Sequence, residues 1–302
     1  MNIRAGIDLG GTKIQVAAFD CNDQQIYQKR IPTPQGDYHA TLKAIHQLIL
    51  SLEKELGSTA SVGIGTPGAI SAQSHLLQNA NSTCLNGKPL LHDLEAQLQR
   101  PVRLSNDANC FALSEAVDGA AKDANNVFGV IIGTGTGAGI VIDKKILQGI
   151  NHIGGEWGHN PLPWPQESEL TSTDCYCGKK GCIETFLSGP GMQLSYFKAT
   201  NLKRSCEEIV NKAEEGDIES EACLQRYEDR MARSLAHIIN ILDPEVIVLG
   251  GGLSKIKRLY TNVPKRLPDY VFSRQAILTK IIPAKFGDAS GVRGAARLWP
   301  LT

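Results

Sequence analysis

Apolar and polar positions alternate in three short segments at the start of the chain. RAGIDLGG predicts a buried strand that ends in a glycine turn, KIQVAAFD predicts a second strand and QQIYQKRIPT a third. Because short turns join them, we expect an antiparallel meander. From Asp37 to Leu56 the apolar residues recur at helical spacing, with Asp37 as the N-cap and Gly57 as the stop.

Strands and helices alternate along the rest of the chain. SVGIGTPG and VRLSN are predicted strands, HDLEAQLQ and DANCFALSEAVDGA are predicted helices, and EVIVLGGG is a core strand that ends in a glycine turn. Ser205 and Glu208 form a capping-box pair at the start of a helix. A long helix is expected from about Ile218 to Leu242. This mixture predicts an α/β fold class.

The segment VFGVIIGTGTGAGIVID repeats the pattern of the N-terminus: an apolar strand, a Gly/Thr turn and another apolar strand. We interpret it as an internal repeat, with one such unit in each of two α/β domains. The chain has 302 residues, which suits two domains of about 100–200 residues each. The N-terminal domain is placed at residues 1–118 and the C-terminal domain at 119–287. A C-terminal helix within 288–302 is expected to return to the first domain.

Composition and charge narrow the class of protein. Hydrophobic residues make up 42% of the chain and charged residues 21%, which is wrong for a disordered chain. Lys plus Arg and Asp plus Glu both number 31, so the chain lacks the basic excess of most nucleic-acid binders. No apolar stretch is long enough to span a membrane and no signal peptide is recognised. We therefore expect a cytoplasmic protein whose eight cysteines are reduced.

Three glycine turns, each directly after an apolar strand, predict a nucleotide site. In GIDLGGTK, residues 6–13, backbone N–H groups are exposed to phosphate oxygens, and Asp8 is placed to hold Mg²⁺ directly or through water. GTGTGAGI, residues 133–140, repeats this design, and LGGGLS, residues 249–254, leaves room for adenine or ribose. An ordinary tight hairpin is the alternative for any one turn. The residues predicted to contact the nucleotide are Gly6, Asp8, Gly10, Gly11, Thr12, Lys13, Gly133, Thr134, Gly135, Gly137, Gly250, Gly251 and Gly252.

The segment SNDAN, residues 105–109, places Asn106 and Asp107 where a strand ends and a helix begins. Asp107 is either only the helix N-cap or a general base, kept ionised by the helix N-terminus, that orients a hydroxyl for phosphoryl transfer. Two polar loops, TPGAI at 66–70 and NANST at 79–83, precede it. Asn side chains in such loops either shape turns or bind sugar hydroxyls.

The most specific pattern in the chain combines one histidine with three cysteines. The cysteines follow a C-x-C-x4-C spacing downstream of the histidine in GGEWGHN. This donor set predicts a closed, structural Zn²⁺ site, whereas a redox pair would need a C-x-x-C. Two nearby carboxylates, Glu156 and Glu184, are either solvent-facing charges or ligands of a polyol. The four predicted zinc ligands are His159, Cys175, Cys177 and Cys182.

Together, GIDLGGTK, GTGTGAG, GEWGH with CYCGKKGCIET, and VIVLGGG resemble the ROK family of sugar kinases and related repressors. The resemblance covers essentially the whole chain. It implies a two-domain actin-like (ribonuclease-H-like) ATPase fold, with ATP and the sugar in the interdomain cleft. It also implies Asp107 as the catalytic base and zinc on the four ligands above. The implied sugar contacts are Gly68, Asn81, Asn106, Asp107, Glu156, His159 and Glu184.

Within the family, NANSTCLNG and WGHNPLPW resemble the manno(fructo)kinase or fructokinase type. The expected activity is Mg²⁺-dependent transfer of the ATP γ-phosphoryl group to the 6-hydroxyl of fructose, and also of mannose. The N-acetylglucosamine kinases of the family are the nearest alternative. The family also implies a homodimer, and no nucleic-acid or membrane partner is expected.

Two other classes are disfavoured. A sugar-responsive ROK repressor is not expected, because the phosphate turn begins at residue 6 and leaves no room for a helix-turn-helix. A glycine-rich oxidoreductase is not expected either, because no strand–turn–helix fingerprint is present.

Overall fold

The computed structural model describes residues 3–170 and 173–300, which group into two compact units. Unit 1 contains the described residues up to Gly119, Gly139–Gly154 and those from Asp288 onward; unit 2 contains Ala120–Ala138 and Gly155–Gly287. The sequence-based boundaries, 1–118 with 288–302 and 119–287, differ from this grouping mainly in one segment, residues 139–154. The domain limits themselves stay a prediction.

The segment 139–154 groups with unit 1 because it packs on the helix α3 (Asp107–Val117). A Cβ on Gly139 would lie 2.6 Å from the Ala108 carbonyl oxygen, so the two backbones are in direct contact. Lys144 Nζ also donates to the Ala116 carbonyl at 2.9 Å. These contacts join residues far apart in the sequence, which is why the hydrophobic pattern did not reveal them.

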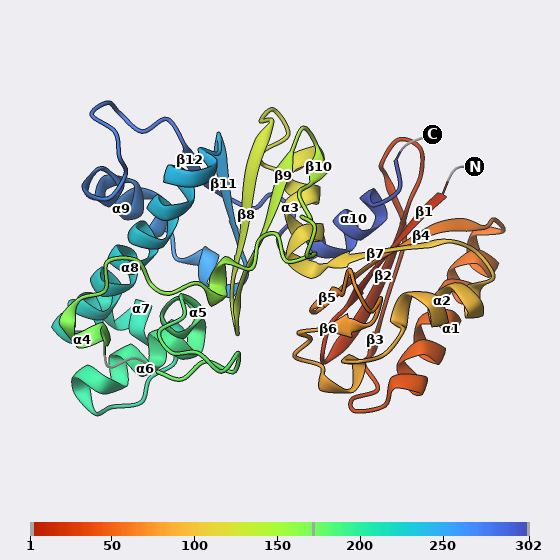
Figure 1. The fold of residues 1–302 in the computed structure, drawn as a ribbon, viewed down its shortest axis with the longest axis horizontal. Coiled ribbons are helices and arrows are strands. Elements are labelled where there is room, and N and C mark those ends of the chain that lie inside the picture. Colours follow the sequence, from red (N-terminus) through yellow and green to blue (C-terminus); the bar gives the residue numbers. More distant parts are fainter. Residues whose placement is uncertain (1–2, 171–172, 301–302) are drawn as a thin grey trace. The chain divides into compact units, whose positions relative to one another are not determined.

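The sheet of unit 1 has the strand order β3-β2-β1-β4-β7 (Figure 1). The first three strands form the predicted antiparallel meander, while β1, β4 and β7 run parallel. A separate pair of short strands, β5 and β6, is antiparallel. The bounds are β1 (Ile3–Leu9), β2 (Lys13–Phe19), β3 (Gln25–Pro32), β4 (Ala60–Thr66), β5 (Ala69–Ile70), β6 (Leu77–Gln78) and β7 (Val102–Asn106).

Helices cover both faces of this sheet. On one face, α1 (Tyr38–Leu56) and α2 (Leu90–Leu98) bury apolar stripes against alternate residues of the strands. The caps of α1 are those predicted: Asp37 accepts from the Ala40 amide at 2.9 Å, and Gly57 takes a left-handed conformation. On the other face, α10 (Ser290–Arg297) packs with α3 against β1 and β4. The predicted return of the C-terminal helix to the first domain is thus confirmed for its described residues.

The second sheet, β10-β9-β8-β11-β12, has the same plan. Strands β8, β11 and β12 run parallel, β9 and β10 are antiparallel, and a glycine turn joins β8 to β9 just as one joins β1 to β2. This correspondence confirms the repeated strand–turn–strand topology. That each domain holds one copy stays a prediction, because β9 passes from unit 2 into unit 1 at Gly139. The bounds are β8 (Asn126–Ile132), β9 (Thr136–Ile142), β10 (Lys145–Ile146), β11 (Val246–Gly250) and β12 (Lys280–Pro283).

The helices of unit 2 include the predicted long helix and the predicted capping box. Ser205 Oγ accepts from the Glu208 amide at 3.2 Å, and the Glu208 carboxylate accepts from the Ser205 amide at 2.6 Å. The bounds are α4 (Glu167–Leu170), α5 (Glu184–Leu187), α6 (Gly189–Thr200), α7 (Cys206–Glu214), α8 (Ile218–Leu242) and α9 (Leu259–Arg266).

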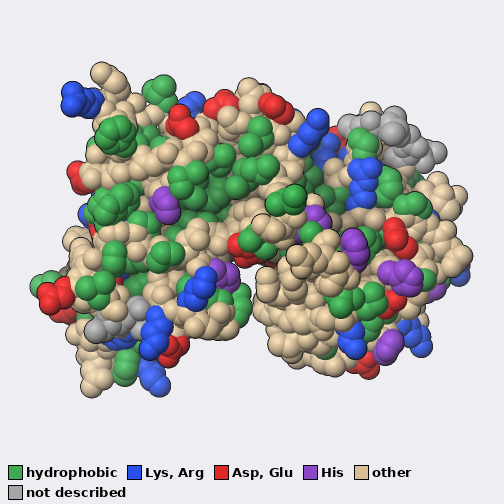
Figure 2. All heavy atoms as spheres, viewed as in Figure 1, with side chains coloured by type: hydrophobic (Ala, Val, Ile, Leu, Met, Phe, Trp, Pro, Cys, Tyr) green, Lys and Arg blue, Asp and Glu red, His purple; other side chains and the backbone are tan. Residues whose placement is uncertain are grey.

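Two surface properties agree with the composition. Within residues 3–170 and 173–300, no helix combines the length and the apolar character needed to cross a bilayer. On the face drawn in Figure 2, the coloured basic side chains are scattered among acidic ones and form no continuous basic patch.

Candidate active site and metal centre

The first glycine turn, residues 10–13 of unit 1, is closed by main-chain bonds and one hydroxyl. The Gly10 amide donates to the Lys13 carbonyl at 3.0 Å, and Thr33 Oγ1 donates to the Gly10 carbonyl at 2.7 Å. Within residues 3–170 and 173–300, the N–H groups of Gly11 and Thr12 donate to no backbone acceptor. These two amides are therefore the ones best suited to donate hydrogen bonds to phosphate oxygens.

A cavity of about 330 Å³ lies beside this turn in unit 1. Its lining includes Gly10, Gly11 and Thr12 from the turn, and Asn81 and Ser82 from the NANST loop. The structure thus brings Asn81, a predicted sugar contact, close to the predicted phosphate contacts.

Asp8 lies on β1, on the side of the sheet that faces α10. A Cβ on Gly291 of that helix would lie 3.5 Å from the Asp8 carboxyl group. Burial raises the pKa of Asp8, the positive charges of Lys13 and Arg30 lower it, and Asp288 raises it. A mostly buried carboxylate is stabilised by a cation, so Asp8 fits the predicted Mg²⁺ site.

The helix α3 begins at Asp107, and its N-cap is Asn106. Asn106 Oδ1 accepts from the Ala108 amide at 2.9 Å, and its Nδ2 donates to the Gly68 carbonyl at 3.1 Å. The alternative in which Asp107 serves only as the N-cap is therefore wrong, because the preceding side chain has that role. Asp107 is the first helical residue, and its Oδ1 also accepts from the Ala108 amide, at 2.8 Å. Its position at the helix N-terminus favours the ionised carboxylate that a general base requires.

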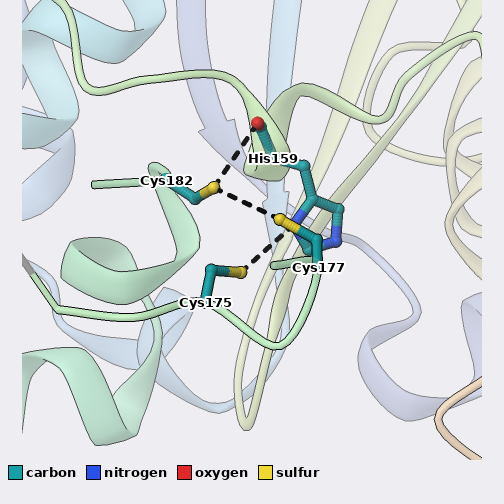
Figure 3. A group of neighbouring side chains, drawn as sticks. All are labelled: His159, Cys175, Cys177 and Cys182. Carbon is teal, nitrogen blue, oxygen red and sulfur yellow. Dashed lines mark hydrogen bonds between the residues drawn. The ribbon is translucent and has the colours of Figure 1, made fainter. Parts of the chain in front are cut away.

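In unit 2, four side chains form a compact group (Figure 3). Their ligand atoms all lie within 4.8 Å of one another. The Sγ atom of Cys175 is 3.5 Å from His159 Nδ1, and the Sγ atoms of Cys177 and Cys182 are 3.6 Å apart. A tetrahedral zinc ion with Zn–S bonds of about 2.3 Å and a Zn–N bond of about 2.0–2.1 Å separates its ligand atoms by about 3.5–3.8 Å. The donor set and its spacing therefore fit zinc.

The backbone around the cysteines explains how they come together. The Cys175 amide donates to the Lys179 carbonyl at 2.8 Å and the Gly178 amide to the Cys175 carbonyl at 3.0 Å, with Gly178 left-handed at φ 85°. The 3.6 Å separation of Cys177 and Cys182 exceeds the ~2.05 Å of a disulfide bond. Burial raises the pKa of the Cys182 thiol to about 12, so its thiolate form needs a cation beside it.

The two ring nitrogens of His159 face different partners. Nδ1 points toward Cys175, while Nε2 lies 2.9 Å from the hydroxyl of Tyr176. Because a metal ion on Nδ1 leaves the ring proton on Nε2, this nitrogen would donate a hydrogen bond to a hydroxyl. In this structure the Tyr176 hydroxyl occupies that nitrogen, so a sugar hydroxyl would have to replace it for His159 to be both a zinc ligand and a sugar contact. Tyr176 was not among the residues predicted from the sequence, although it lies between two of the predicted ligand cysteines, Cys175 and Cys177.

The two carboxylates predicted to bind the sugar in unit 2 lie close to His159. Burial raises the pKa of Glu156, His159 lowers it, and Glu184 raises it, so these three residues share one electrostatic environment. Glu184 Oε2 accepts from the Thr136 amide at 2.8 Å, which ties it to the second glycine turn. That contact was not expected from the sequence, because it joins residues 48 positions apart.

The second glycine turn, residues 133–136 of unit 2, also leaves two amides for a ligand. The Gly133 amide donates to the Gly135 carbonyl at 2.9 Å, and the Thr136 amide is taken by Glu184. Within residues 3–170 and 173–300, the N–H groups of Thr134 and Gly135 donate to no backbone acceptor. Their N–H groups fit the predicted phosphate contacts.

Other predicted nucleotide glycines have different environments. Gly6 lies inside the β1–β2 ladder opposite Ala17, and a Cβ there would lie 1.9 Å from the Val292 carbonyl oxygen of α10. Gly6 is thus explained by packing, and a phosphate contact from it stays a prediction. In the third turn, Gly251 is left-handed at φ 83°, and a Cβ on Gly252 would meet nothing within 4 Å. This open space agrees with the predicted room for adenine or ribose. Gly137 lies within β9 and Gly250 ends β11.

Comparisons with known proteins identify the family to which the chain belongs. The family model described as "ROK family" matches residues 4–301. N-acetyl-D-glucosamine kinases of Yersinia enterocolitica and Vibrio atlanticus are each 41% identical to this chain over 297 residues, which is 97% of this chain and 98% of each relative. The solved ROK hexokinase of Thermus thermophilus is 28% identical, with a TM-score of 0.85 over 97% of this chain and 96% of that one.

A ROK family glucokinase of Streptomyces griseus, solved with glucose and AMPPNP, has a TM-score of 0.78 at 23% identity over 98% of this chain and 99% of that one. At this identity the likeness concerns the fold alone, which is the actin-like, ribonuclease-H-like fold. The chain belongs to the ROK family. Within that family it is a sugar kinase, an ATP:sugar phosphotransferase. The relatives favour the N-acetylglucosamine alternative over the expected fructokinase.

Proposed function

We propose that the protein is an N-acetyl-D-glucosamine kinase that transfers the γ-phosphoryl group of ATP to the 6-hydroxyl of the sugar. The supporting observation is the 41% identity, over 97% of the chain, to N-acetyl-D-glucosamine kinases. The fructokinase hypothesis depended on two short loops, NANSTCLNG and WGHNPLPW, whereas this identity extends along the whole sequence.

In the proposed mechanism, Asp107 orients the sugar hydroxyl and accepts its proton late in the transfer. Its place at the start of α3 supports this role, since the helix N-terminus stabilises the charge. The Nε2–H group of His159 donates to a sugar hydroxyl that takes the place of the Tyr176 hydroxyl, and carboxylates accept from other sugar hydroxyls. The full set of proposed sugar contacts is Gly68, Asn81, Asn106, Asp107, Glu156, His159 and Glu184.

On the nucleotide side, the amides of Gly11, Thr12, Thr134 and Gly135 hold phosphate oxygens, and Lys13 adds a positive charge. Asp8 holds Mg²⁺, which neutralises charge on the phosphates when bound. The zinc site has four protein ligands and no open position, so we assign it a structural role. It holds the segments that carry Glu156 and Glu184.

We also infer a cytoplasmic homodimer. All eight cysteines are unpaired as disulfides, which supports a reducing compartment. The dimer is implied by family membership alone.

The test is ADP release with saturating ATP over N-acetylglucosamine, fructose, mannose and glucose. We expect the kcat/KM for N-acetylglucosamine to exceed that for fructose by at least about tenfold, because a pocket that holds the acetamido group leaves its polar atoms unpaired with fructose. A larger kcat/KM for fructose would return the protein to the fructokinase type. Sugar binding by calorimetry without ADP release for any of the four would instead indicate a sugar sensor.

A further inference from the structure

The second glycine turn is held by residues that flank the predicted zinc ligands. Glu184, which follows Cys182 by two positions, accepts from the Thr136 amide through Oε2 at 2.8 Å. On the other side of the turn, the Gly189 amide donates to the Gly133 carbonyl at 2.7 Å. Both ends of the turn are therefore fixed by the segment that begins at the last zinc ligand.

The other zinc-bearing segment packs against the same turn. Gly158 precedes His159, and a Cβ at Gly158 would lie 2.1 Å from the Thr136 carbonyl oxygen. Trp157 packs edge-on against Phe128 of β8, with ring centroids 5.6 Å apart. The backbone of the turn is thus in contact with both segments that supply zinc ligands.

Gly135 is the position that lets the Glu184 carboxylate approach. A Cβ at Gly135 would lie 2.8 Å from Glu184 Oε2, closer than real Cβ atoms come, so the carboxylate would have to move away from the Thr136 amide. A carboxylate has about four lone-pair positions. Glu184 can therefore accept from the turn and from a sugar hydroxyl at the same time.

We propose that Glu184 is a positioning residue for the nucleotide. By fixing the Thr136 amide, it sets the direction of the neighbouring N–H groups of Thr134 and Gly135 toward phosphate. The same carboxylate is a proposed sugar contact, so it couples the two substrates: each ligand raises the affinity for the other by the same factor. This inference rests on the proposed function and adds a role on the nucleotide side to a residue assigned only to the sugar.

The test is calorimetric titration with AMP-PNP and Mg²⁺, with and without N-acetylglucosamine. Glu184→Ala removes the acceptor, so AMP-PNP affinity in the absence of sugar should fall by about tenfold, the weight of one charged hydrogen bond. Glu184→Gln keeps an acceptor oxygen, so that affinity should stay within about threefold of wild type. Glu214 is exposed in the last turn of α7, so Glu214→Ala is the matched control. It should leave the AMP-PNP affinity unchanged both with and without N-acetylglucosamine.

If Glu184→Ala weakens sugar binding but leaves the sugar-free AMP-PNP affinity unchanged, Glu184 is a sugar contact only and the proposal is overturned. Because this measurement contains no sugar, it does not depend on which sugar is the substrate. The zinc content of each variant, measured in parallel, shows whether the metal site survived.

A double-mutant cycle with Gly135→Ala gives a second, independent answer. In the wild-type background the added methyl group displaces the carboxylate, so AMP-PNP affinity should fall by about fivefold to tenfold. In the Glu184→Ala background there is no carboxylate to displace, and most of this effect should vanish. An equal loss in both backgrounds would show that Gly135 acts without Glu184.

Discussion

The two strand–turn–strand motifs of this protein, β1–β2 and β8–β9, have the same topology, but their glycine turns are stabilised differently. The first turn is closed by its own backbone and by Thr33, a residue of the adjoining loop. The second turn depends on Glu184 and Gly189, which lie about 50 positions further along the chain, close to the predicted zinc ligands. A local turn forms with its hairpin, whereas the second turn needs the surrounding fold, and its geometry becomes linked to the metal site.

The two carboxylates proposed for the active site, Asp107 in unit 1 and Glu184 in unit 2, differ in the same way. Asp107 lies at the start of its own helix, where its Oδ1 accepts from the Ala108 amide. Glu184 contacts the second turn directly. We therefore expect changes in unit 1 to separate chemistry from nucleotide binding, and changes around the zinc site to affect both.

The largest expected effect is that of Asp107→Asn. Asn keeps the shape and the hydrogen bond to Ala108 but cannot accept the proton, so kcat should fall by roughly 10²–10⁴-fold. Since Asn106 is the N-cap, the helix should keep its cap and the protein should remain folded. Sugar affinity by calorimetry should stay within about tenfold of wild type, the weight of one hydrogen bond. A kcat within a few-fold of wild type would mean that the base lies elsewhere.

The next effect is that of removing the metal through Cys177→Ser. Loss of a thiolate ligand should empty the site and release the segments that hold Glu184 and Gly158 against the second turn. We expect turnover to fall by about 100-fold or more, beyond the usual cost of disturbing a metal's outer shell. Elemental analysis should find about one zinc per wild-type chain and much less in the variant. The exposed Cys21 supplies the control, Cys21→Ser, which should keep its zinc.

This prediction would be contradicted if folded, active wild-type protein purified without added metal contained less than about a tenth of an equivalent of zinc. In that case the four side chains would be a cluster of thiols and a histidine without a resident ion, and the second turn would be held by protein contacts alone.

A smaller effect is expected from Asp8→Asn, with a characteristic pH dependence. Burial raises the pKa of Asp8 in the folded protein above its usual 3.8. The stability contributed by the neutral form is therefore present at low pH and is lost as the pH rises through the raised pKa. Without Mg²⁺, wild type should lose stability over that range, whereas the Asn variant, which is always neutral, should not.

At pH 7.5 in EDTA we expect Asp8→Asn to unfold at the same urea concentration as wild type or a higher one. Its affinity for AMP-PNP with Mg²⁺ should nevertheless fall by about tenfold, because a charged partner of the ion is lost. If the variant is clearly less stable than wild type under these conditions, Lys13 and Arg30 already satisfy the Asp8 carboxylate and no cation is needed.

How far the sequence predicted the structure depends on the range of the interactions involved. The meander and the caps of α1 follow local patterns, and the structure confirms both. The four predicted zinc ligands also follow a local pattern, and their ligand atoms lie within 4.8 Å of one another, but their binding of zinc stays a prediction. The sequence does not decide whether Asn106 or Asp107 caps α3, because either polar side chain can cap a helix. The structure assigns the cap to Asn106, the residue at which β7 ends.

Contacts made between distant residues could not be inferred from local patterns. The bond between Glu184 and Thr136 depends on how α5 packs beside β9, and the bond between Thr33 and Gly10 depends on the register of β3. The sugar is a similar case, since two short loops suggested fructose while the whole-chain identity favours N-acetylglucosamine. Gly6 was also ambiguous, because a glycine that makes room for a helix and a glycine that contacts phosphate look the same in a motif.

The smallest effect is expected from Gly6→Ala. This change tests whether Gly6 makes room for α10 or contacts a phosphate. Its new Cβ would lie 1.9 Å from the Val292 carbonyl oxygen and 2.7 Å from the Ala296 amide nitrogen, both backbone atoms of α10. Pushing the helix away from the sheet should lower the free energy of unfolding by about 1–3 kcal/mol, as overpacking does. Gly252→Ala adds the same methyl group where nothing lies within 4 Å, so its stability should change by no more than about 0.5 kcal/mol. Urea unfolding of both variants measures the difference. If Gly6→Ala is as stable as wild type but binds AMP-PNP more weakly, Gly6 contacts the nucleotide and the packing explanation fails.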